Sequence, residues 1–323
     1  MKGQKLTAKT KKNLKVFNFF LISIIFVVIA ASIAVVGFNF IGNRNFTEKF
    51  YSVSSIKVNN KIRIIQISDL HECTYGTDNS KLLERVEKLN PDMIILTGDC
   101  IDVDLESSDT VLNLCKALTD IAPSYYIYGN NEVEKYYDYV LTLESLDDEL
   151  GFNDSNRDPD KLLEIKDPFQ NELEAAGVVV LKNSYDTIKV GDTYIDVYGV
   201  LTSNISSFWP YAGESFGEFL YTNENHLKIT AIHEPQIFEE YTPDYWGDLM
   251  LAGHTHGGLV KIPLIGPLYT PEGGLLPGRG GHYVYGRYEV EGRPLIVSSG
   301  LSNHELFRIN NEPELVIVDF NKF

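Results

Sequence analysis

The chain has 323 residues, of which 44% are hydrophobic and 23% charged, and this length accommodates one large domain or two small ones. Its three cysteines, Cys73, Cys100 and Cys115, show no Cys-x-x-Cys spacing, which argues against a disulfide framework and against a thiolate zinc site. The net charge of −17 is unevenly distributed: residues 1–49 hold eight Lys or Arg and one Glu, whereas the remainder holds 20 basic and 44 acidic residues. That acidic body is unsuited to binding nucleic acid through phosphate neutralisation, so no nucleic-acid partner is expected.

The N-terminal segment predicts a membrane anchor. Six lysines within residues 1–15 precede an uncharged, mostly apolar stretch at residues 16–42, which is long enough to cross about 30 Å of hydrocarbon. The lysine excess on its N-terminal side predicts a cytoplasmic N-terminus and an extracytoplasmic body in a single-pass protein of the cell membrane. The alternative is a cleaved signal peptide, with the small residues Ser32 to Ala34 as the cleavage site. The long apolar stretch beyond that site favours an uncleaved anchor.

After the anchor, residues 43–60 are expected to form a short linker, and the catalytic domain is expected at residues 61–323. Its first part alternates compact apolar runs with segments of helical periodicity. The predicted strands are 61–68, 92–97 and 124–128, and the predicted helices between them are 79–91 and 109–122. This β-α-β-α-β series predicts a parallel sheet with right-handed crossovers.

The second part of the domain is richer in strands. Predicted strands are 178–181, 193–200, 227–232, 248–252, 258–263, 282–290, 293–299 and 314–320. Two segments look like insertions: residues 141–170 are acidic and partly helical, and residues 203–226 are aromatic and loop-like. Each either overhangs a site or forms a solvated surface excursion.

Polar side chains that suit metal ions follow five of the predicted strands. The motifs are "SDLHE", "TGDC", "GNNE", "IHEP" and "GHTHGG". Each motif alone is weak, since an Asp-x-His triplet is usually a surface accident and Gly-Asp or Gly-Asn is usually a turn. In open α/β sheets, however, sites form outside the carboxyl ends of strands. We therefore expect one cluster of seven ligands: Asp69, His71, Asp99, Asn130, His233, His254 and His256.

The residue types in this cluster predict two divalent metal ions. Two ions about 3.5–4 Å apart repel each other and need a shared anion, for which Asp99 is the natural bridge. Asp69, His71 and His256 would complete one metal site. The other would be completed by Asn130, His233 and His254. Ligands of imidazole, carboxylate and amide without sulfur suit manganese, iron or zinc. A bridging hydroxide, available near neutral pH, would then attack phosphorus in line with the leaving oxygen.

Taken in this order, the five motifs resemble those of the calcineurin-like metallophosphoesterase superfamily, from about Lys61 to Phe320. The anchor and the C-terminal tail from Gly258 to Phe320 resemble its bacterial membrane-associated branch. The resemblance implies an α/β fold: a four-layer α/β/β/α sandwich with two mixed β-sheets, here preceded by one transmembrane helix. It also implies the metal assignments made above.

The sequence departs from the superfamily at Asn131. Members usually read Gly-Asn-His-Glu or Gly-Asn-His-Asp, and that histidine is held to stabilise the transition state or to protonate the leaving oxygen. Asn131 donates hydrogen bonds but carries no proton that titrates near neutrality. Three interpretations follow: the leaving group needs no protonation, another acid (His304, His282 or Glu132) replaces the histidine, or catalysis is weak.

The sequence therefore predicts a membrane-anchored, dinuclear metal-dependent phosphoesterase with Asp99 and Asn131 at its catalytic centre. The favoured substrate is a phosphodiester or pyrophosphate, with lipid-linked compounds at the membrane surface as the favoured class. No protein partner is implied. The alternative is a metal-dependent binding or sensing protein with little or no catalysis, because Asn131 replaces the usual histidine.

Overall fold

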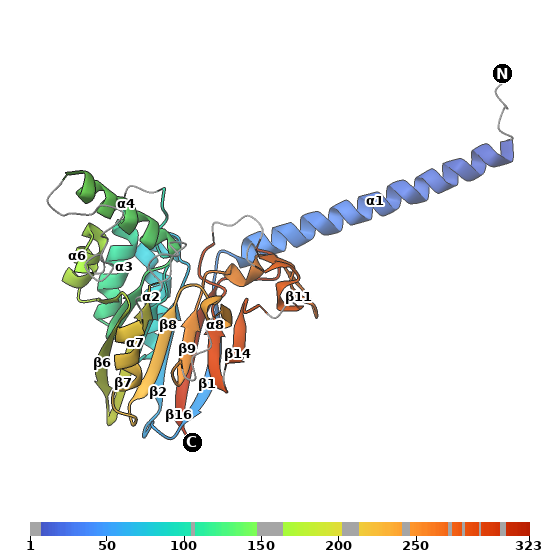
Figure 1. Ribbon diagram of the computed structural model, residues 1–323. Helices are drawn as coiled ribbons and strands as arrows, with labels where there is room; N and C mark the ends of the chain where they lie inside the picture. The colour runs from blue at the N-terminus through green and yellow to red at the C-terminus, as the bar shows by residue number, and fades with distance from the viewer. Residues whose placement is uncertain are drawn as a thin grey trace.

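The computed structural model describes residues 8–104, 107–146, 164–201, 213–240, 246–270, 273–279, 282–290, 292–303 and 308–323. Helix α1 (Ala8–Gly42) extends away from the rest of the chain (Figure 1). It contains a candidate membrane span, Lys15–Ala34, none of which is buried against the body. By length and composition this segment could be a membrane span or a signal sequence.

The first large sheet, which we call sheet A, contains the predicted β-α-β-α-β series. Its strand order is β1-β16-β2-β3-β4-β5. The strand bounds are β1 Thr47–Ser55, β16 Glu314–Lys322, β2 Ile62–Ile67, β3 Met93–Leu96, β4 Ser124–Ile127 and β5 Val179–Leu181. Strands β2 to β5 are parallel, as predicted, and β16 runs antiparallel to β2. Helices α2 (Ser80–Leu89) and α3 (Asp109–Thr119) make the two crossovers.

The second large sheet, sheet B, has the order β14-β15-β9-β8-β7-β6. The strand bounds are β14 Gly286–Val290, β15 Arg293–Val297, β9 Leu249–Ala252, β8 Leu227–Ile232, β7 Thr193–Val200 and β6 Ser184–Val190. The four central strands are parallel and the two edge strands are antiparallel to their neighbours. Both large sheets are therefore mixed.

Three groups of buried apolar residues define four layers. The first lies between sheet A and the helices α2, α3, α4 (Asn130–Leu146) and α6 (Pro168–Ala175). The second fills the space between the two sheets, where β2, β3 and β4 face β7, β8 and β9. The third lies between sheet B and the helices α7 (Gly213–Leu220) and α8 (Ile237–Glu240). This α/β/β/α arrangement confirms the expected fold (Figure 1).

Shorter elements connect the layers. The 3-10 helices are η1 (Thr77–Asn79), η4 (His256–Gly258) and η5 (Pro277–Arg279). Two small hairpins follow η4, and their strands are β10 (Lys261–Ile262), β11 (Gly266–Pro267), β12 (Tyr269–Thr270) and β13 (Gly274–Leu275). Only the two residues of β10 are strand within the predicted segment 258–263.

Residues 43–60 differ from the expected linker. They contain β1, which pairs in parallel with β16 over nine residues of each strand. The sequence "TEKFYSVSS" has no buried apolar run, because β1 is an edge strand with mostly exposed or half-buried side chains, and its partner lies at the other end of the chain. Strand β6 was not predicted either, because it is also an edge strand with exposed or half-buried side chains.

The two expected insertions are described in part. Within 203–226, helix α7 packs into the third core group through the fully buried Phe219, so this part is framework and not a surface excursion. Residues 202–212 lie outside the described part of the chain, as do residues 147–163 of the other segment. The ends of that segment belong to α4 and α6.

Candidate metal centre

The seven predicted ligands meet at one edge of the sandwich. Strands β2, β3 and β4 of sheet A and β8 and β9 of sheet B end there, and each ligand lies on the loop or helix start that follows. Because these strands are parallel within each sheet, their carboxyl ends share an edge. Ligands contributed by segments from Asp69 to His256 therefore come together only in the fold.

Five of the seven have an unusual backbone conformation. Positive φ angles occur at Asp69 (49°), His71 (48°), Asp99 (49°), His254 (71°) and His256 (48°). Residues other than glycine seldom adopt this left-handed conformation, and such residues cluster at functional sites. Here the strain turns the side chains back over the strand ends, toward one another.

Two glycines allow the loops of sheet A to approach closely. A Cβ atom on Gly98, whose φ is +85°, would lie 2.3 Å from the backbone nitrogen of Gly129. A Cβ on Gly129 would lie 2.3 Å from Oδ1 of Asp99. The "GD" and "GN" motifs thus need glycine because the backbone and carboxylate occupy the space of a side chain.

Asp69, His71 and His256 form the first ligand group, with all ligand atoms within 4.8 Å of one another. Nε2 of His256 lies 3.4 Å from Oδ1 of Asp69 and 3.2 Å from Nε2 of His71. Two ligands each about 2.1 Å from one ion lie roughly 3 to 3.4 Å apart, so these separations suit a shared cation.

Asp99, His233 and His254 form the second group. Nδ1 of His254 lies 3.2 Å from Nε2 of His233 and 2.9 Å from Oδ1 of Asn130. Asn130 is thereby brought to this group as predicted, and it offers a neutral amide oxygen.

Asp99 lies between the two groups. Its Oδ2 is 3.2 Å from Nε2 of His233 and 4.0 Å from Nε2 of His71. Its Oδ1 accepts a hydrogen bond from the backbone N–H of Asn131 at 2.9 Å. One carboxylate is therefore positioned to serve both groups.

Outer contacts fix the imidazole rings. Nδ1 of His233 donates to the carbonyl oxygen of Thr97 at 2.7 Å, so that Nε2 faces the cluster. Nδ1 of His71 lies 2.7 Å from Oδ1 of Asp102 and is oriented in the same way. Asp102 was not predicted from the sequence, where its signal was a second carboxylate three residues after Asp99 in "GDCID".

The electrostatics of the cluster favour positive charge. Burial lowers the pKa of His233, but the charges of Asp99 and Asp69 and the hydrogen bond to Asp99 outweigh it and raise the pKa to about 10. Burial also lowers the pKa of His71, yet the hydrogen bond to Asp102 and the nearby aspartates raise it to about 9. Burial alone would raise the pKa of Asp99, but His233 and His71 hold it well below its ordinary value.

Asn131, the departure from the family pattern, is engaged with its neighbours. Its Nδ2 donates to the carbonyl oxygen of Ile101 at 2.9 Å, and its Oδ1 accepts from Nδ2 of Asn130 at 3.1 Å. The second contact turns Oδ1 of Asn130 toward His254. The described contacts of Asn131 thus hold the Asn130 amide in place.

Glu132, one of the three candidate replacement acids, has a different role. It is 1% exposed, and its carboxylate accepts hydrogen bonds from the backbone N–H groups of Asp99, Cys100, Ile101 and Gly129 and from the hydroxyl of Tyr126. These contacts join the loops after β3 and β4, and both oxygens of the carboxylate are engaged in them as hydrogen-bond acceptors. Of the other two candidates, His282 is half-buried and His304 lies outside the described residues.

The donor set fits divalent metal ions. Each group combines imidazole nitrogens with a carboxylate, no sulfur is present among the seven ligands, and the carboxylate of Asp99 faces both groups. Nitrogen atoms of two histidines face each other in both groups, and a cation between them would satisfy both lone pairs.

Comparison with known proteins gives the family. A family model described as calcineurin-like phosphoesterase matches residues 62–258, which is more than half of the chain. The chain therefore belongs to the calcineurin-like phosphoesterase family and is a metal-dependent phosphoric ester hydrolase.

Several curated proteins are similar over most of their length. The uncharacterized metallophosphoesterase YkuE of Bacillus subtilis is 25% identical over 79% of this chain and 77% of its own. The phosphodiesterase YaeI of Escherichia coli is 23% identical over 80% of this chain and 81% of its own. The UDP-2,3-diacylglucosamine pyrophosphatase LpxG of Chlamydia muridarum is 25% identical over 80% and 83%. Among solved structures, the phosphopantetheinyl hydrolase of Mycobacterium tuberculosis aligns with a TM-score of 0.42 at 13% identity, covering 76% of this chain and 90% of that one.

Proposed function

We propose that this protein is a membrane-anchored, dinuclear metal-dependent phosphoesterase that hydrolyses a phosphodiester or pyrophosphate, with a lipid-linked substrate as the favoured class. The observation that carries the proposal is the pair of ligand groups on either side of Asp99, supplied by five strand ends. A single structural ion would need only one such group.

The seven candidate ligands would hold two divalent ions, for which manganese, iron or zinc suit the donors. When bound, such ions supply Lewis acidity toward a phosphoryl oxygen and lower the pKa of water to near neutrality. The chain's own residues prepare this site. Thr97 and Asp102 orient the rings of His233 and His71, and the N–H of Asn131 holds Asp99 so that its second oxygen faces both groups.

Both ligand groups contain residues open to solvent. The side chains of His71 and His256 are 18% and 14% exposed, and Asn130 and His254 are half-buried, whereas the side chain of His233 is fully buried. We infer that substrate enters over these half-buried residues, with His233 at the closed side.

Asn131 bears on the substrate class. A leaving oxygen cannot receive a proton from its amide, so substrates whose leaving group is already a weak base are favoured. Diesters of activated alcohols and pyrophosphates meet this condition. The names of two relatives, a phosphodiesterase and a pyrophosphatase acting on a diacylglucosamine nucleotide, support the same class.

The location follows from α1. We propose that the apolar stretch at residues 16–42, which contains most of the candidate span Lys15–Ala34, crosses the cell membrane without cleavage, with the six lysines on the cytoplasmic side and the metal centre outside the cytoplasm. A lipid-linked ester would then be within reach of the site.

The proposal is tested by Mn²⁺-dependent hydrolysis with the full-length protein in detergent. Bis(p-nitrophenyl) phosphate is compared with p-nitrophenyl phosphate, and the Asp99→Asn variant serves as the blank. We expect turnover of the diester to exceed that of the monoester and to vanish in the variant. Faster turnover of the monoester would contradict the substrate class, and equal turnover in the Asp99→Asn variant would contradict the metal centre.

The role of position 131 is read from a leaving-group series. Diesters with p-nitrophenolate and with the more basic phenolate are compared in the wild type and in Asn131→His. Without an acid at this position, the wild-type rate should fall steeply as the leaving group becomes more basic, and histidine should flatten that dependence. An unchanged dependence would show that another group already protonates the leaving oxygen.

A further inference from the structure

Apolar side chains are concentrated on the two small hairpins that follow the metal-ligand loop. We call residues 259–270 and 273–275, which carry β10 to β13, the hairpin module. Leu264 at the tip of the first hairpin is fully exposed, Leu275 is 72% exposed and Tyr269 is 55% exposed. Ile265 and Leu259 are exposed as well. From Leu259 to Leu275 the sequence contains only one lysine and one glutamate.

The backbone of the hairpin module makes these exposed side chains more unusual. Leu264 has a φ of 66° and Leu259 a φ of 49°, in the left-handed region where glycine or asparagine is accommodated with less strain. Turn tips are normally polar for the additional reason that they face water. A leucine that is both strained and exposed suggests that its apolar side chain is used in contact with something else.

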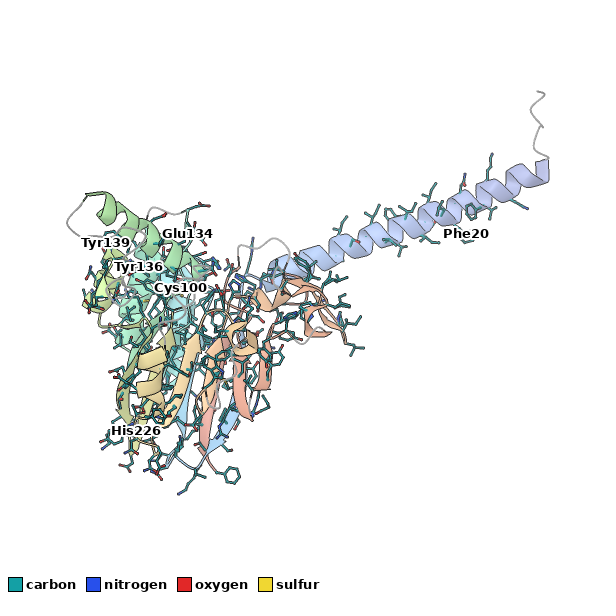
Figure 2. The ribbon with its side chains drawn as sticks, in the orientation of Figure 1. Phe20, Cys100, Glu134, Tyr136, Tyr139 and His226 are labelled. Carbon is teal, nitrogen blue, oxygen red and sulfur yellow. The ribbon has the colours of Figure 1, made fainter. Side chains whose placement is uncertain are left out.

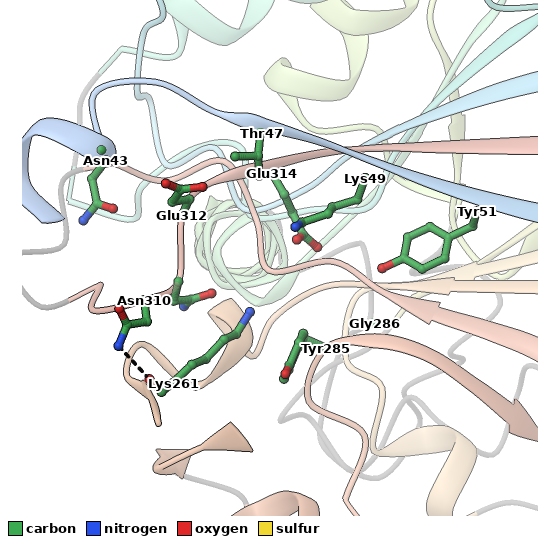
Figure 3. Close-up of a pocket in the computed structure, with 12 residues that line it drawn as sticks. Asn43, Thr47, Lys49, Tyr51, Lys261, Tyr285, Gly286, Asn310, Glu312 and Glu314 are labelled. Atoms are coloured by element: carbon green, nitrogen blue, oxygen red, sulfur yellow. Dashed lines mark hydrogen bonds between the residues drawn. The ribbon is translucent and has the colours of Figure 1, made fainter. Parts of the chain in front are cut away.

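The hairpin module is built onto the end of helix α1. The side chain of Asn43, the residue after α1, donates to the carbonyl oxygen of Arg308 at 3.1 Å. The next residue, Ile309, bonds through its carbonyl oxygen to the backbone N–H of Lys261 in β10 at 2.9 Å. The side chain of Asn310 donates to the carbonyl oxygen of Lys261 at 3.2 Å (Figure 3).

A polar cavity of about 670 Å³ occupies the same junction. Asn43, Thr47, Lys261, Asn310 and Glu312 are among its lining residues (Figure 3). None of the seven candidate metal ligands lines it. The end of α1 and the hairpin module thus both border this cavity. Figure 1 shows β11 on the side of the body from which α1 leaves.

The helix leaves almost no spacer between this junction and a bilayer. The apolar stretch runs from residue 16 to Gly42, which is about 40 Å of helix, compared with about 30 Å of hydrocarbon. Asn43, directly after it, is already buried in the body. An inserted α1 therefore draws the hairpin module up to the membrane surface.

We propose that the hairpin module is a second membrane contact, in which Leu264, Ile265 and Leu275 enter the boundary between headgroups and acyl chains beside α1. Tyr269 suits this depth because an aromatic ring with a polar hydroxyl partitions to the interface. The proposal rests on the membrane-spanning role of α1 given above.

The consequence concerns the metal centre. The candidate ligand His256 begins η4, and only Gly257 and Gly258 separate it from the hairpin module. A module seated in the interface would hold the His71 and His256 side of the site next to lipid headgroups. Substrate presented from the bilayer would then reach the centre without leaving the membrane.

The test uses the full-length protein in liposomes and fluorescence of an environment-sensitive dye on single introduced cysteines. The three native cysteines are buried, so labelling is directed to the new positions. Leu264→Cys reports the hairpin module, and Phe26→Cys reports the middle of the apolar helix. Tyr221→Cys, 91% exposed and directly after α7, is the matched control. His226, five residues further on, lies far from α1 (Figure 2). Lipids with a nitroxide at a shallow or a deep acyl position serve as quenchers.

We expect deep quenching at position 26, shallow quenching with protection from aqueous iodide at position 264, and neither at position 221. A dye at 264 as accessible to iodide as the one at 221, with position 26 quenched, would overturn the hairpin contact but leave the anchor standing. No quenching at position 26 would overturn the anchor, and the hairpin proposal with it. Protection at 264 without quenching by any nitroxide lipid would indicate contact with a second copy of the chain and would also overturn the proposal.

Discussion

Two buried polar clusters in the described part of the chain, one within sheet B and one at the common edge of both sheets, are built in opposite ways. In the first, Asp196 on β7 faces Lys228 on β8 in register, with their charged groups 3.2 Å apart. The same carboxylate accepts hydrogen bonds from Thr187, Thr222 and His226. In the second, the metal centre, imidazole nitrogens face each other at 3.2 Å in both ligand groups.

The two clusters also differ in backbone conformation. Asp196 and Lys228 belong to regular strands, whereas five of the seven candidate metal ligands have positive φ. The Asp196 cluster is balanced in charge and saturated with hydrogen bonds, so it needs nothing from outside the chain. The metal centre combines strain with facing lone pairs, and this combination indicates a site that a cation completes. Burial of charge therefore does not distinguish a structural cluster from a functional one. The two differ in whether the polar groups already have hydrogen-bond and charge partners within the chain.

The largest expected effect is the loss of activity in Asp99→Asn. This substitution removes the anion that faces both ligand groups, and even the loss of an outer contact to a metal ligand typically costs 10–100-fold. We expect hydrolysis at background level and a lowered content of bound metal, measured by elemental analysis of the purified protein. Retention of a full metal complement would contradict the bridging position.

Asp196→Asn should instead lower stability and leave metal content and activity unchanged. The substitution leaves Lys228 buried without its charged partner, which typically destabilises a protein by about 3–5 kcal/mol. We expect a fall of that size in the free energy of unfolding, measured by urea denaturation in detergent. Metal content and specific activity of the folded fraction should be unchanged. A loss of metal in this variant would show that the two clusters are coupled.

A smaller effect is expected at Asp102, which holds the ring of His71. Asp102→Asn should lower metal affinity by about 10–100-fold without unfolding the protein, because the imidazole loses its orienting carboxylate. Titration calorimetry with Mn²⁺ measures the change. The matched control is Asp104→Asn, an exposed aspartate two residues away, which should bind as the wild type does. Equal losses in both variants would indicate a general charge effect.

A change with pH is expected as well, and the two histidines of the metal centre and Asp196 should respond with opposite sign. The raised pKa values of His71 (about 9) and His233 (about 10) mean that metal must displace one proton from each group. Affinity for Mn²⁺ should therefore increase about tenfold per pH unit between pH 6 and 8. An affinity independent of pH would show that these rings are neutral before metal binds.

Thermal unfolding provides the second readout of the pH effect. In the metal-free protein, the raised pKa values of the two histidines stabilise the fold below about pH 6.5, and this contribution is lost as pH rises through about 9 and 10. Burial raises the pKa of Asp196, but the hydrogen bonds that its carboxylate accepts lower the pKa by more, so that the pKa lies below its ordinary value. Its contribution is thus present above about pH 3.9 and lost as the pH falls. The acid loss should be smaller in Asp196→Asn, with the lowered pKa of Asp99 contributing the same sign of loss in both proteins, and the alkaline loss should remain.

Much of this protein could be predicted from local sequence. The apolar runs of β2, β3, β4, β8 and β9 are buried on both faces, so each appears as a continuous hydrophobic segment ending in polar residues. That pattern was sufficient to predict the parallel series, the common edge and all seven residues that the fold brings together there. The lysine-flanked apolar helix was equally evident, because its length and composition depend on no distant contact.

Other features were decided only by tertiary structure. Strand β1 exists because β16, more than 250 residues away, offers it a pairing edge, and an edge strand with exposed side chains has no local signature. The roles of Asp102, Asn131 and Glu132 depend on which atoms lie within hydrogen-bond distance across loops, and sequence spacing does not specify that. The apolar tips of the hairpin module were not predicted from the sequence, because exposure is a property of the folded surface. The residue types define the chemistry available to this chain, while long-range packing determines which of those residues meet at the candidate metal centre, which hold the candidate ligands and which are exposed at the surface.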